Sequence, residues 1–394
     1  MQRKKQGILI KSSLTTSEAY SAYVPNPLPP VPAIEMAEVE ASYNLALLAV
    51  EALNDVAEAV PNPSVLNYMY MRKEAVLSSQ IEGTQSTLDD LLRYESKQAT
   101  GVTLDDVEEV SGYVAALNHG LKRLEEGFPM SLRLIREIHK ILLETSRGRN
   151  KTPGEFRASQ NWIGGSRPGN ARFVPAPPDK VMELMGELEK FMYRDDMPPL
   201  FRAALIHQQF ETIHPFLDGN GRTGRLLITL FLCEQGFLKS PFLYLSLFFK
   251  KNRNLYYEKL DIVRRNGDWE NWLNFFFEGI AETANDARQT LVAIKKIFAQ
   301  SDEKIAGIGR PRISVSRVFT EFKRKPLLTI AEITAMTGLA KNTAISAVER
   351  LIALGILKNT SEKKWGQIYV YSDYTAILAP DTEKLSALTK NVHS

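Results

Sequence analysis

Cysteine is almost absent from this chain, which has a single one, Cys233, among its 394 residues. One thiol cannot form a disulfide within the chain, and the sequence offers no cysteine spacing for a structural zinc site. Cys233 lies in an apolar run, so we expect a buried core thiol. A disulfide-stapled secreted architecture is excluded, and a reducing cytoplasm is the expected compartment.

Long apolar runs and an excess of one charge are lacking as well. No stretch approaches the about 18 apolar residues of a membrane-spanning helix, and the apolar run near the basic start is too short for a signal peptide. The 49 lysines and arginines face 46 aspartates and glutamates, a formal net charge of +3. So mild a charge does not by itself indicate nucleic acid, and we expect no membrane partner.

Helical patterning, in contrast, runs along most of the sequence. Apolar residues recur at the three- and four-residue spacing of helices that bury one face, and 44% hydrophobic residues suffice for the cores of two or three domains. We therefore predict a mainly α fold. It begins with an extended proline-rich segment over 1–33, and helices follow over 35–59, 64–82, 103–126, 131–145, 179–193 and 200–212. The aromatic residues of 268–287 complete the core, and 293–309 holds a charged helix that gives way to a linker at Gly307 and Gly309.

A glycine-punctuated region interrupts these helices over 152–178. Two short apolar or aromatic segments flank 166–170, which predicts a β-hairpin with a flexible tip over 162–175. Its first half carries Ile163, Gly164 and Gly165. A hairpin inside a helical domain usually serves as a lid or as a docking edge.

The C-terminal part, 311–380, is expected to be a separate domain. A helix, a turn at Gly338, a second helix over 341–354 and two strand-like pieces around 363–366 form the pattern of a winged helix-turn-helix. From Glu303 to Tyr371 it has 12 lysines and arginines against 5 acidic residues. The second helix could contact DNA, but winged folds also bind proteins, so both partners stay open.

The richest chemistry lies in the twelve residues His214–Arg225, HPFLDGNGRTGR. Apolar helical segments precede and follow it, so we predict a tight turn between two core helices, with the second helix beginning inside 219–221. Backbone N–H groups and the positive end of the dipole gather at such a start and bind anions. Arg222 and Arg225 share one helix face and can reach the same anion.

An acidic residue stands at an unusual position near the end of the helix over 64–82. Glu82 lies at the C-terminal end, where the helix dipole disfavours a carboxylate. Gly83 follows as the expected terminating residue, and Ser78 lies one turn earlier. Glu82 is either a solvated surface residue or a carboxylate that meets a cation elsewhere in the fold.

The twelve-residue motif resembles the signature of the Fic family, H-x-F-x-D/E-G-N-G-R-x-x-R, at every defined position. Ser78–Gly83 resembles the inhibitory motif of that family, S/T-x-x-x-E-G/N, and 162–175 resembles its flap. The resemblance implies an N-terminal segment and helix over 1–60 that pack on the core. It also implies a Fic domain over 61–300 with an inhibitory helix over about 64–83, and a winged-helix domain over 311–380.

Fic enzymes transfer AMP from ATP to a hydroxyl of a protein, so the resemblance implies a nucleotidyltransferase with ATP as substrate and Mg²⁺ as cofactor. It makes His214 the general base and Asp218 the Mg²⁺ ligand, and it makes Arg225 the residue that holds the γ-phosphate. Flap residues Ile163, Gly164 and Gly165 would align the protein substrate. The nucleotide would contact Asp218, Gly219, Asn220, Gly221, Arg222, Thr223, Gly224 and Arg225, with Tyr256 and Tyr257 beside the adenine.

By the same resemblance, Glu82 pairs with Arg225 and inhibits the enzyme by taking the guanidinium that should hold the γ-phosphate. Two alternatives stay open. The same scaffold in other Fic proteins removes AMP or transfers another phosphate-containing group. In an alternative of another class, the protein is a DNA-binding regulator whose Fic core senses a nucleotide. The oligomeric state also stays open, with a homodimer as the commonest arrangement.

Overall fold

The computed structural model describes residues 6–12, 19–59, 63–97, 102–144, 147–360 and 367–382. The protein is mainly helical, as the apolar spacing predicted. Its contacts divide it into two compact units. The first comprises Met1–Val50, Ser111–Lys239 and Leu245–Thr283, and the second comprises Glu51–Val110, Ser240–Tyr244 and Ala284–Ser394.

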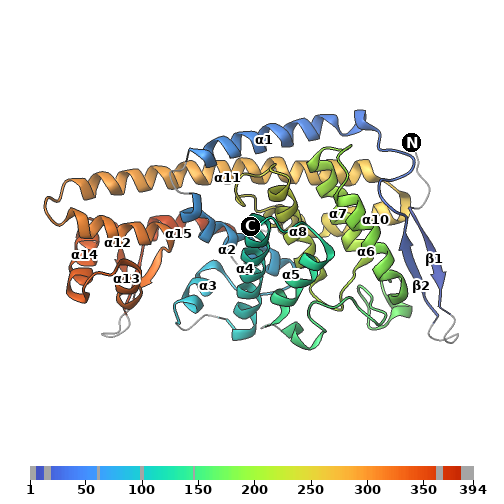
Figure 1. The fold of residues 1–394 in the computed structure, drawn as a ribbon, viewed down its shortest axis with the longest axis horizontal. Helices are drawn as coiled ribbons and strands as arrows, with labels where there is room; N and C mark the ends of the chain where they lie inside the picture. Colours follow the sequence, from blue (N-terminus) through green and yellow to red (C-terminus); the bar gives the residue numbers. More distant parts are fainter. Residues whose placement is uncertain are drawn as a thin grey trace, which may run out of the picture. The chain divides into compact units, whose positions relative to one another are not determined.

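The first unit contains the central motif and a body of short helices (Figure 1). Its elements are β1 (Gly7–Lys11), β2 (Ser21–Pro25), η1 (Met36–Glu38), α5 (Leu132–Glu144), η2 (Arg147–Asn150), η3 (Pro168–Asn170), α6 (Pro178–Met192), α7 (Pro199–Ile213), α8 (Asn220–Glu234), α9 (Ser246–Lys251) and α10 (Arg253–Asn266).

Three long helices run through the division between the units: α1 (Glu40–Glu58), α4 (Leu104–Glu125) and α11 (Trp269–Ala306). The sequence predicted a separate charged helix within 293–309, whereas α11 is one continuous helix of 38 residues. The residues Arg288 to Val292 include neither glycine nor proline, so nothing in the backbone ends the helix there. It ends at Ala306, directly before the break predicted at Gly307.

The core of the first unit is built around α7, which is buried along its whole length. The indole of Trp272 donates to the carbonyl oxygen of Ala204 at 2.9 Å. His207 lies beside it, with Nδ1 3.1 Å from the carbonyl oxygen of Gly224 and Nε2 2.9 Å from the hydroxyl of Tyr256. Because a carbonyl only accepts, Nδ1 carries the proton, and burial lowers the pKa of this imidazole to about 3.

The second unit contains α2 (Pro63–Ile81) and the C-terminal elements. The bounds of α2 match the predicted helix over 64–82 within one residue. The other elements are α3 (Leu88–Glu95), α12 (Arg312–Arg324), β3 (Leu327–Thr329), α13 (Ile330–Thr337), α14 (Lys341–Ala353), β4 (Lys358–Asn359), β5 (Ile368–Val370), α15 (Ser372–Leu378) and η4 (Pro380–Thr382).

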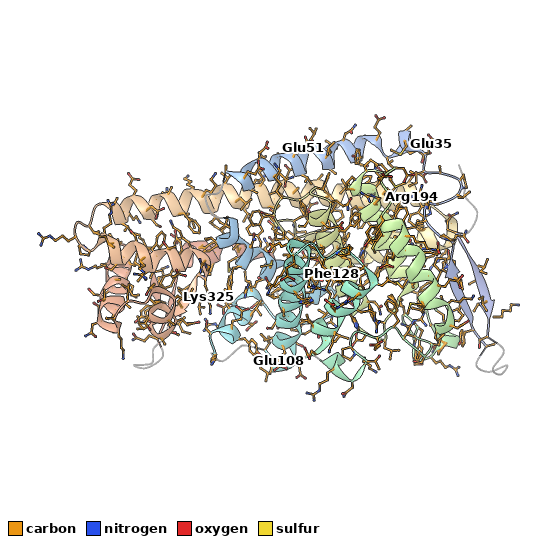
Figure 2. The ribbon with its side chains drawn as sticks, viewed as in Figure 1. Glu35, Glu51, Glu108, Phe128, Arg194 and Lys325 are labelled. Carbon is orange, nitrogen blue, oxygen red and sulfur yellow. The ribbon has the colours of Figure 1, made fainter. Side chains whose placement is uncertain are left out.

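The C-terminal elements form a small module of helices with a three-stranded antiparallel sheet in the order β3-β5-β4. Thr329 and Glu332 form a capping box at the start of α13, and Lys325 (labelled in Figure 2) donates to Glu332 at 2.6 Å. The predicted strand pieces around 363–366 lie outside the described residues. The helices agree with the predicted bounds, and the winged-helix assignment remains a prediction.

The N-terminal segment includes two extended strands, in agreement with the extended segment predicted over 1–33, but the pairing of the strands was not predicted. β1 and β2 pair as an antiparallel hairpin with Gly7 opposite Pro25 and Lys11 opposite Ser21. The backbone N–H of Tyr23 then donates to the carbonyl oxygen of Val174 at 2.9 Å, so β2 extends the flap region. β2 is covered along most of its length, with only Ser21 exposed.

Within the described residues, we find no helix long and apolar enough to cross a lipid bilayer. Cys233 lies half-buried on α8, and burial raises the pKa of its thiol to about 12. The thiol is therefore protonated at neutral pH and is a poor nucleophile.

Candidate active site

The junction between α7 and α8 forms the turn that the sequence predicted. α7 ends at Ile213, and His214 adopts the left-handed conformation with φ 51° and ψ 61°. α8 begins at Asn220, and Gly219 precedes it with φ 75°. Gly219 tolerates this conformation because it lacks a Cβ, whereas His214 adopts it at a cost of roughly 1–3 kcal/mol.

Two side chains from the segment just before the flap hold His214 in this strained conformation. Arg157 Nε donates to the carbonyl oxygen of His214 at 2.9 Å, and Asn161 Nδ2 donates to the same oxygen at 3.3 Å. Asn161 also donates to the carbonyl oxygen of Phe216 at 2.8 Å. The hydrogen bond from the charged Arg157 contributes roughly 1.5–3 kcal/mol, which is comparable to the strain.

Arg157 is almost fully buried, and its guanidinium also donates to the carbonyl oxygens of Ala176 and Ile213. Burial lowers its pKa to about 10, so it keeps its charge at neutral pH. Nothing in the sequence pattern indicated a role for Arg157 or Asn161. No local pattern could reveal one, because Arg157 lies 57 residues before the carbonyl that it binds.

The loop between His214 and α8 is closed by the side chain of Asn220. Its Oδ1 accepts from the backbone N–H of Phe216 at 2.8 Å, and its Nδ2 donates to the carbonyl oxygen of the same residue at 2.8 Å. The family resemblance made Asn220 a contact of the nucleotide. In this structure the amide orients the loop, and Asn220 is buried.

A second buried histidine supports the loop from α5. His139 stacks on the ring of Phe216 at 3.6 Å between centroids. The N–H of Gly154 donates to its Nδ1 at 2.8 Å, and its Nε2 lies 2.9 Å from the carbonyl oxygen of Asp218. These partners require a neutral ring with the proton on Nε2. Burial lowers the pKa of His139 to about 4, so the ring stays neutral above that pH.

His139 was also missed by the sequence analysis. It lies on the apolar face of α5, where a core histidine is the ordinary interpretation, and its contact with Asp218 spans 79 residues. It therefore belongs with Arg157 and Asn161 to a set of side chains that fix the backbone of the motif through long-range contacts.

The start of α8 concentrates positive charge in a buried place. Arg222 and Arg225 are only 4% and 2% exposed, and they lie in the first two turns, where the helix dipole is also positive. A Cβ at Gly224 would lie 2.5 Å from Glu211 Oε1, so glycine permits α8 to approach α7 closely. This end of the helix can bind an anion such as a phosphate chain.

Asp218 stands at the edge of this anion site with 43% of its side chain exposed. Its Oδ1 accepts from the backbone N–H of Gly219 at 2.6 Å and lies 3.8 Å from a guanidinium nitrogen of Arg222. The described residues contain no group of three or more His, Cys, Asp or Glu that could hold a metal. One exposed carboxylate does fit Mg²⁺, which commonly binds one or two carboxylates together with phosphate oxygens.

The flap is less regular than the hairpin that we predicted over 162–175. Ile163 and Phe173 form a single antiparallel bridge, with backbone hydrogen bonds of 2.8 and 3.1 Å. Gly164 and Gly165 follow with φ 69° and 77° and turn the chain out of strand geometry. Asn170 then closes the tip by accepting from two backbone N–H groups.

The two tyrosines that resemblance assigned to the adenine differ in their surroundings. Tyr256 is buried, its hydroxyl is bonded to His207, and its ring stacks on Phe249 at 4.4 Å. Tyr256 thus belongs to the core of the unit. Tyr257 is half-buried.

The residues of the predicted inhibitory motif lie together at the end of α2, in the second unit. Ser78 is buried, α2 ends at Ile81, and Glu82 follows with an exposed side chain. Gly83 has φ 103°, a conformation that favours glycine. The expected helix end is therefore confirmed, whereas pairing of Glu82 with Arg225 stays a prediction.

Comparison with known proteins finds two family profiles. The profile described as Fic/DOC family matches residues 129–232, and the profile described as Fic/DOC family N-terminal matches residues 41–122. The protein adenylyltransferases Fic of Drosophila yakuba and Drosophila melanogaster are each 26% identical over 292 residues, which cover 70% of this chain and 54% of theirs. The chain thus spans about half the length of these relatives.

Solved structures resemble the fold as well. A Fic family protein from Desulfovibrio desulfuricans G20 matches with a TM-score of 0.54 at 18% identity, over 88% of this chain and 97% of that one. Residues 134–508 of Fic-1 from C. elegans match with a TM-score of 0.51 at 23% identity, over 66% of this chain and 75% of that one. At these identities the likeness concerns the fold alone.

Proposed function

We propose that this chain is a protein adenylyltransferase of the Fic/DOC family, because residues 129–232 and 41–122 match the two profiles of that family. It transfers AMP from ATP to a serine, threonine or tyrosine hydroxyl of a protein, which can be another chain or its own. The observation that carries the proposal is the turn between α7 and α8, where a held histidine precedes a buried, positively charged helix start.

The triphosphate of ATP binds at the start of α8. The backbone N–H groups of 219–221 contact the α- and β-phosphates, and Gly219 is the N-cap of the helix. Arg222 and Arg225 neutralise the charge on the β- and γ-phosphates. Asp218 holds Mg²⁺, which supplies further electrostatic stabilisation of the phosphate charge when it is bound.

His214 performs the proton transfer. Its imidazole accepts the proton of the substrate hydroxyl while the oxygen attacks the α-phosphorus. The bond between the α-phosphorus and the bridging oxygen breaks, AMP becomes attached to the protein, and pyrophosphate leaves. The hydrogen bonds of Arg157 and Asn161 to the His214 carbonyl hold the backbone from which the imidazole extends.

Glu82 restrains this activity. Its carboxylate stands exposed just beyond the end of α2, and it pairs with the guanidinium of Arg225 that should hold the γ-phosphate. ATP then binds with its α-phosphate displaced from the position for in-line attack. A displacement of about 1 Å can slow a reaction roughly a hundredfold.

Comparison of two radioactive labels tests the reaction type. Incubation of the Glu82→Gly protein with α-labelled ATP is expected to label protein, and incubation with γ-labelled ATP is expected to leave it unlabelled, because the γ-phosphate departs with pyrophosphate. Label from γ-labelled ATP alone would instead indicate a kinase. Release of AMP from a previously modified protein, without any transfer from ATP, would indicate an enzyme that removes AMP by hydrolysis.

A further inference from the structure

The turn η4 at the C-terminal end of the described chain binds the helix that carries the inhibitory motif. All of its contacts with α2 and α3 lie within the second unit. Asp381 Oδ2 lies 2.8 Å from Nζ of Lys73 on α2. The carbonyl oxygen of Thr382 accepts from Nε2 of Gln80 at 2.8 Å, and its hydroxyl lies 3.4 Å from the backbone N–H of Leu88.

Lys73 depends on this turn because it is only 1% exposed. Its ammonium also lies 4.4 Å above the ring of Tyr244, which provides a favourable but weaker contact. A buried ammonium is strongly unfavourable unless a carboxylate compensates it. The 28% exposed Asp381 supplies that carboxylate from a segment 308 residues away in the sequence.

Gln80 connects η4 to the inhibitory motif itself. It lies between Ser78 and Glu82, and it is seven residues from Lys73, so both side chains share one face of α2. Its amide nitrogen donates to the carbonyl oxygens of Ser86 and Thr382, both at 2.8 Å. One amide thereby ties the last turn of α2 to the loop that follows it and to the C-terminal turn.

η4 is itself connected to the C-terminal module. One residue, Tyr371, joins β5 to α15, and its hydroxyl lies 2.8 Å from Ser301 Oγ and 3.1 Å from the carbonyl oxygen of Ile297. Its backbone N–H donates to the carbonyl oxygen of Pro326 at 2.8 Å. A rearrangement of this module therefore reaches η4 through a short and well-anchored connection.

We propose that η4 is a latch that holds the inhibitory segment at the end of α2, so that the C-terminal module controls AMP transfer by binding or releasing it. The inference rests on the proposed inhibitory role of Glu82. The contacts at Lys73 and Gln80 restrain the helix end, and loss of these contacts frees Glu82 to leave Arg225. A ligand or partner that rearranges the C-terminal module could thereby change the rate of AMP transfer.

The test uses the full-length Asp381→Asn protein, which loses the carboxylate charge and keeps the shape of the side chain. We expect amide hydrogen exchange over 73–82 to become faster. We also expect incorporation of label from α-labelled ATP into the protein to rise at least about fivefold, the lower end of common allosteric coupling. Lys73→Met removes the other partner and should act in the same direction.

Asp373→Asn is the matched control, because Asp373 is an exposed aspartate in the first turn of α15. It should change neither exchange over 73–82 nor transfer. In the Glu82→Gly background, Asp381→Asn should add no further increase, because the restraint then has no inhibitory group to hold.

The outcomes separate the latch from the proposed inhibition. If Glu82→Gly raises transfer while Asp381→Asn and Lys73→Met do not, the latch is wrong and the inhibitory role survives. Unchanged exchange over 73–82 in both latch variants, or an equal rise of transfer in Asp373→Asn, also overturns it. If Glu82→Gly itself leaves transfer unchanged, the inhibitory role fails and the regulatory meaning of the latch fails with it.

Discussion

Replacement of His214 by alanine is expected to lower AMP transfer by a factor of about 10² to 10⁴, the range that general bases contribute. The variant is best made in the Glu82→Gly background, where the starting rate is high enough to measure the loss. The reason is chemical, since alanine cannot accept the proton of the attacking hydroxyl. Initial rates of incorporation from α-labelled ATP provide the measurement.

Binding of ATP should change little in the same variant, because the start of α8 rather than His214 holds the triphosphate. His119→Ala is a suitable control, since His119 is a partly exposed histidine that pairs with Glu137 at 3.1 Å outside the motif. Loss of the α7–α8 turn would be detected as weakened ATP binding. Transfer that survives the His214→Ala change with intact ATP binding would rule out His214 as the base.

Replacement of Glu82 by glycine is expected to raise AMP transfer roughly a hundredfold, the cost of a displacement of about 1 Å at the reacting centre. Removal of the carboxylate leaves the guanidinium of Arg225 to the γ-phosphate, which brings the α-phosphate into line for attack. Incorporation from α-labelled ATP into the wild-type and variant proteins measures the effect. If the variant labels no better than the wild type, the inhibitory assignment is wrong.

Two further proteins show whether the gain has this cause. Glu125→Gly is the matched control, because Glu125 is an exposed glutamate at the end of α4, and it should leave transfer at the wild-type level. The double variant Glu82→Gly, Arg225→Ala should lose the gain, because the guanidinium that Glu82→Gly makes available to the γ-phosphate is then missing. A gain that persists without Arg225 would mean that Glu82 acts through another residue.

The central motif could be predicted from the sequence because its information is local. Apolar runs on both sides predicted α7 and α8, and the glycines predicted the turn between them with the helix start inside 219–221. The end of α2 before Gly83 followed from equally local signals, a helical apolar pattern and a terminating glycine. These are features that a few neighbouring residues decide.

The support around the motif could not be predicted in the same way, because it depends on tertiary contacts. Arg157 and His139 act on carbonyl oxygens 57 and 79 residues away, and either would read as an ordinary surface or core residue from its neighbours. Tyr256 shows the same limit, since only its bond to His207 reveals that it belongs to the core. The family resemblance, not the spacing of residues, had placed it beside the adenine.

Other differences between prediction and structure concern where elements end, how regular they are and which strands pair. The charged stretch before 309 suggested a separate helix, but a continuous helix needs only the absence of a breaker, and α11 runs through 288–292 without one. The flap was predicted as a regular hairpin, whereas the positive φ angles of Gly164 and Gly165 limit it to one bridge. The N-terminal segment was predicted to be extended, which its strands β1 and β2 bear out, but their pairing with each other was not predicted.

A crystal structure of the Glu82→Gly protein with Mg²⁺ and an ATP analogue that cannot be cleaved between the α- and β-phosphates tests the central claim most directly. We predict phosphate oxygens within hydrogen-bonding distance of the N–H groups of 219–221, the γ-phosphate on Arg225, and the imidazole of His214 beside the α-phosphate. A nucleotide bound elsewhere, or bound here with its α-phosphate remote from His214, would contradict the account.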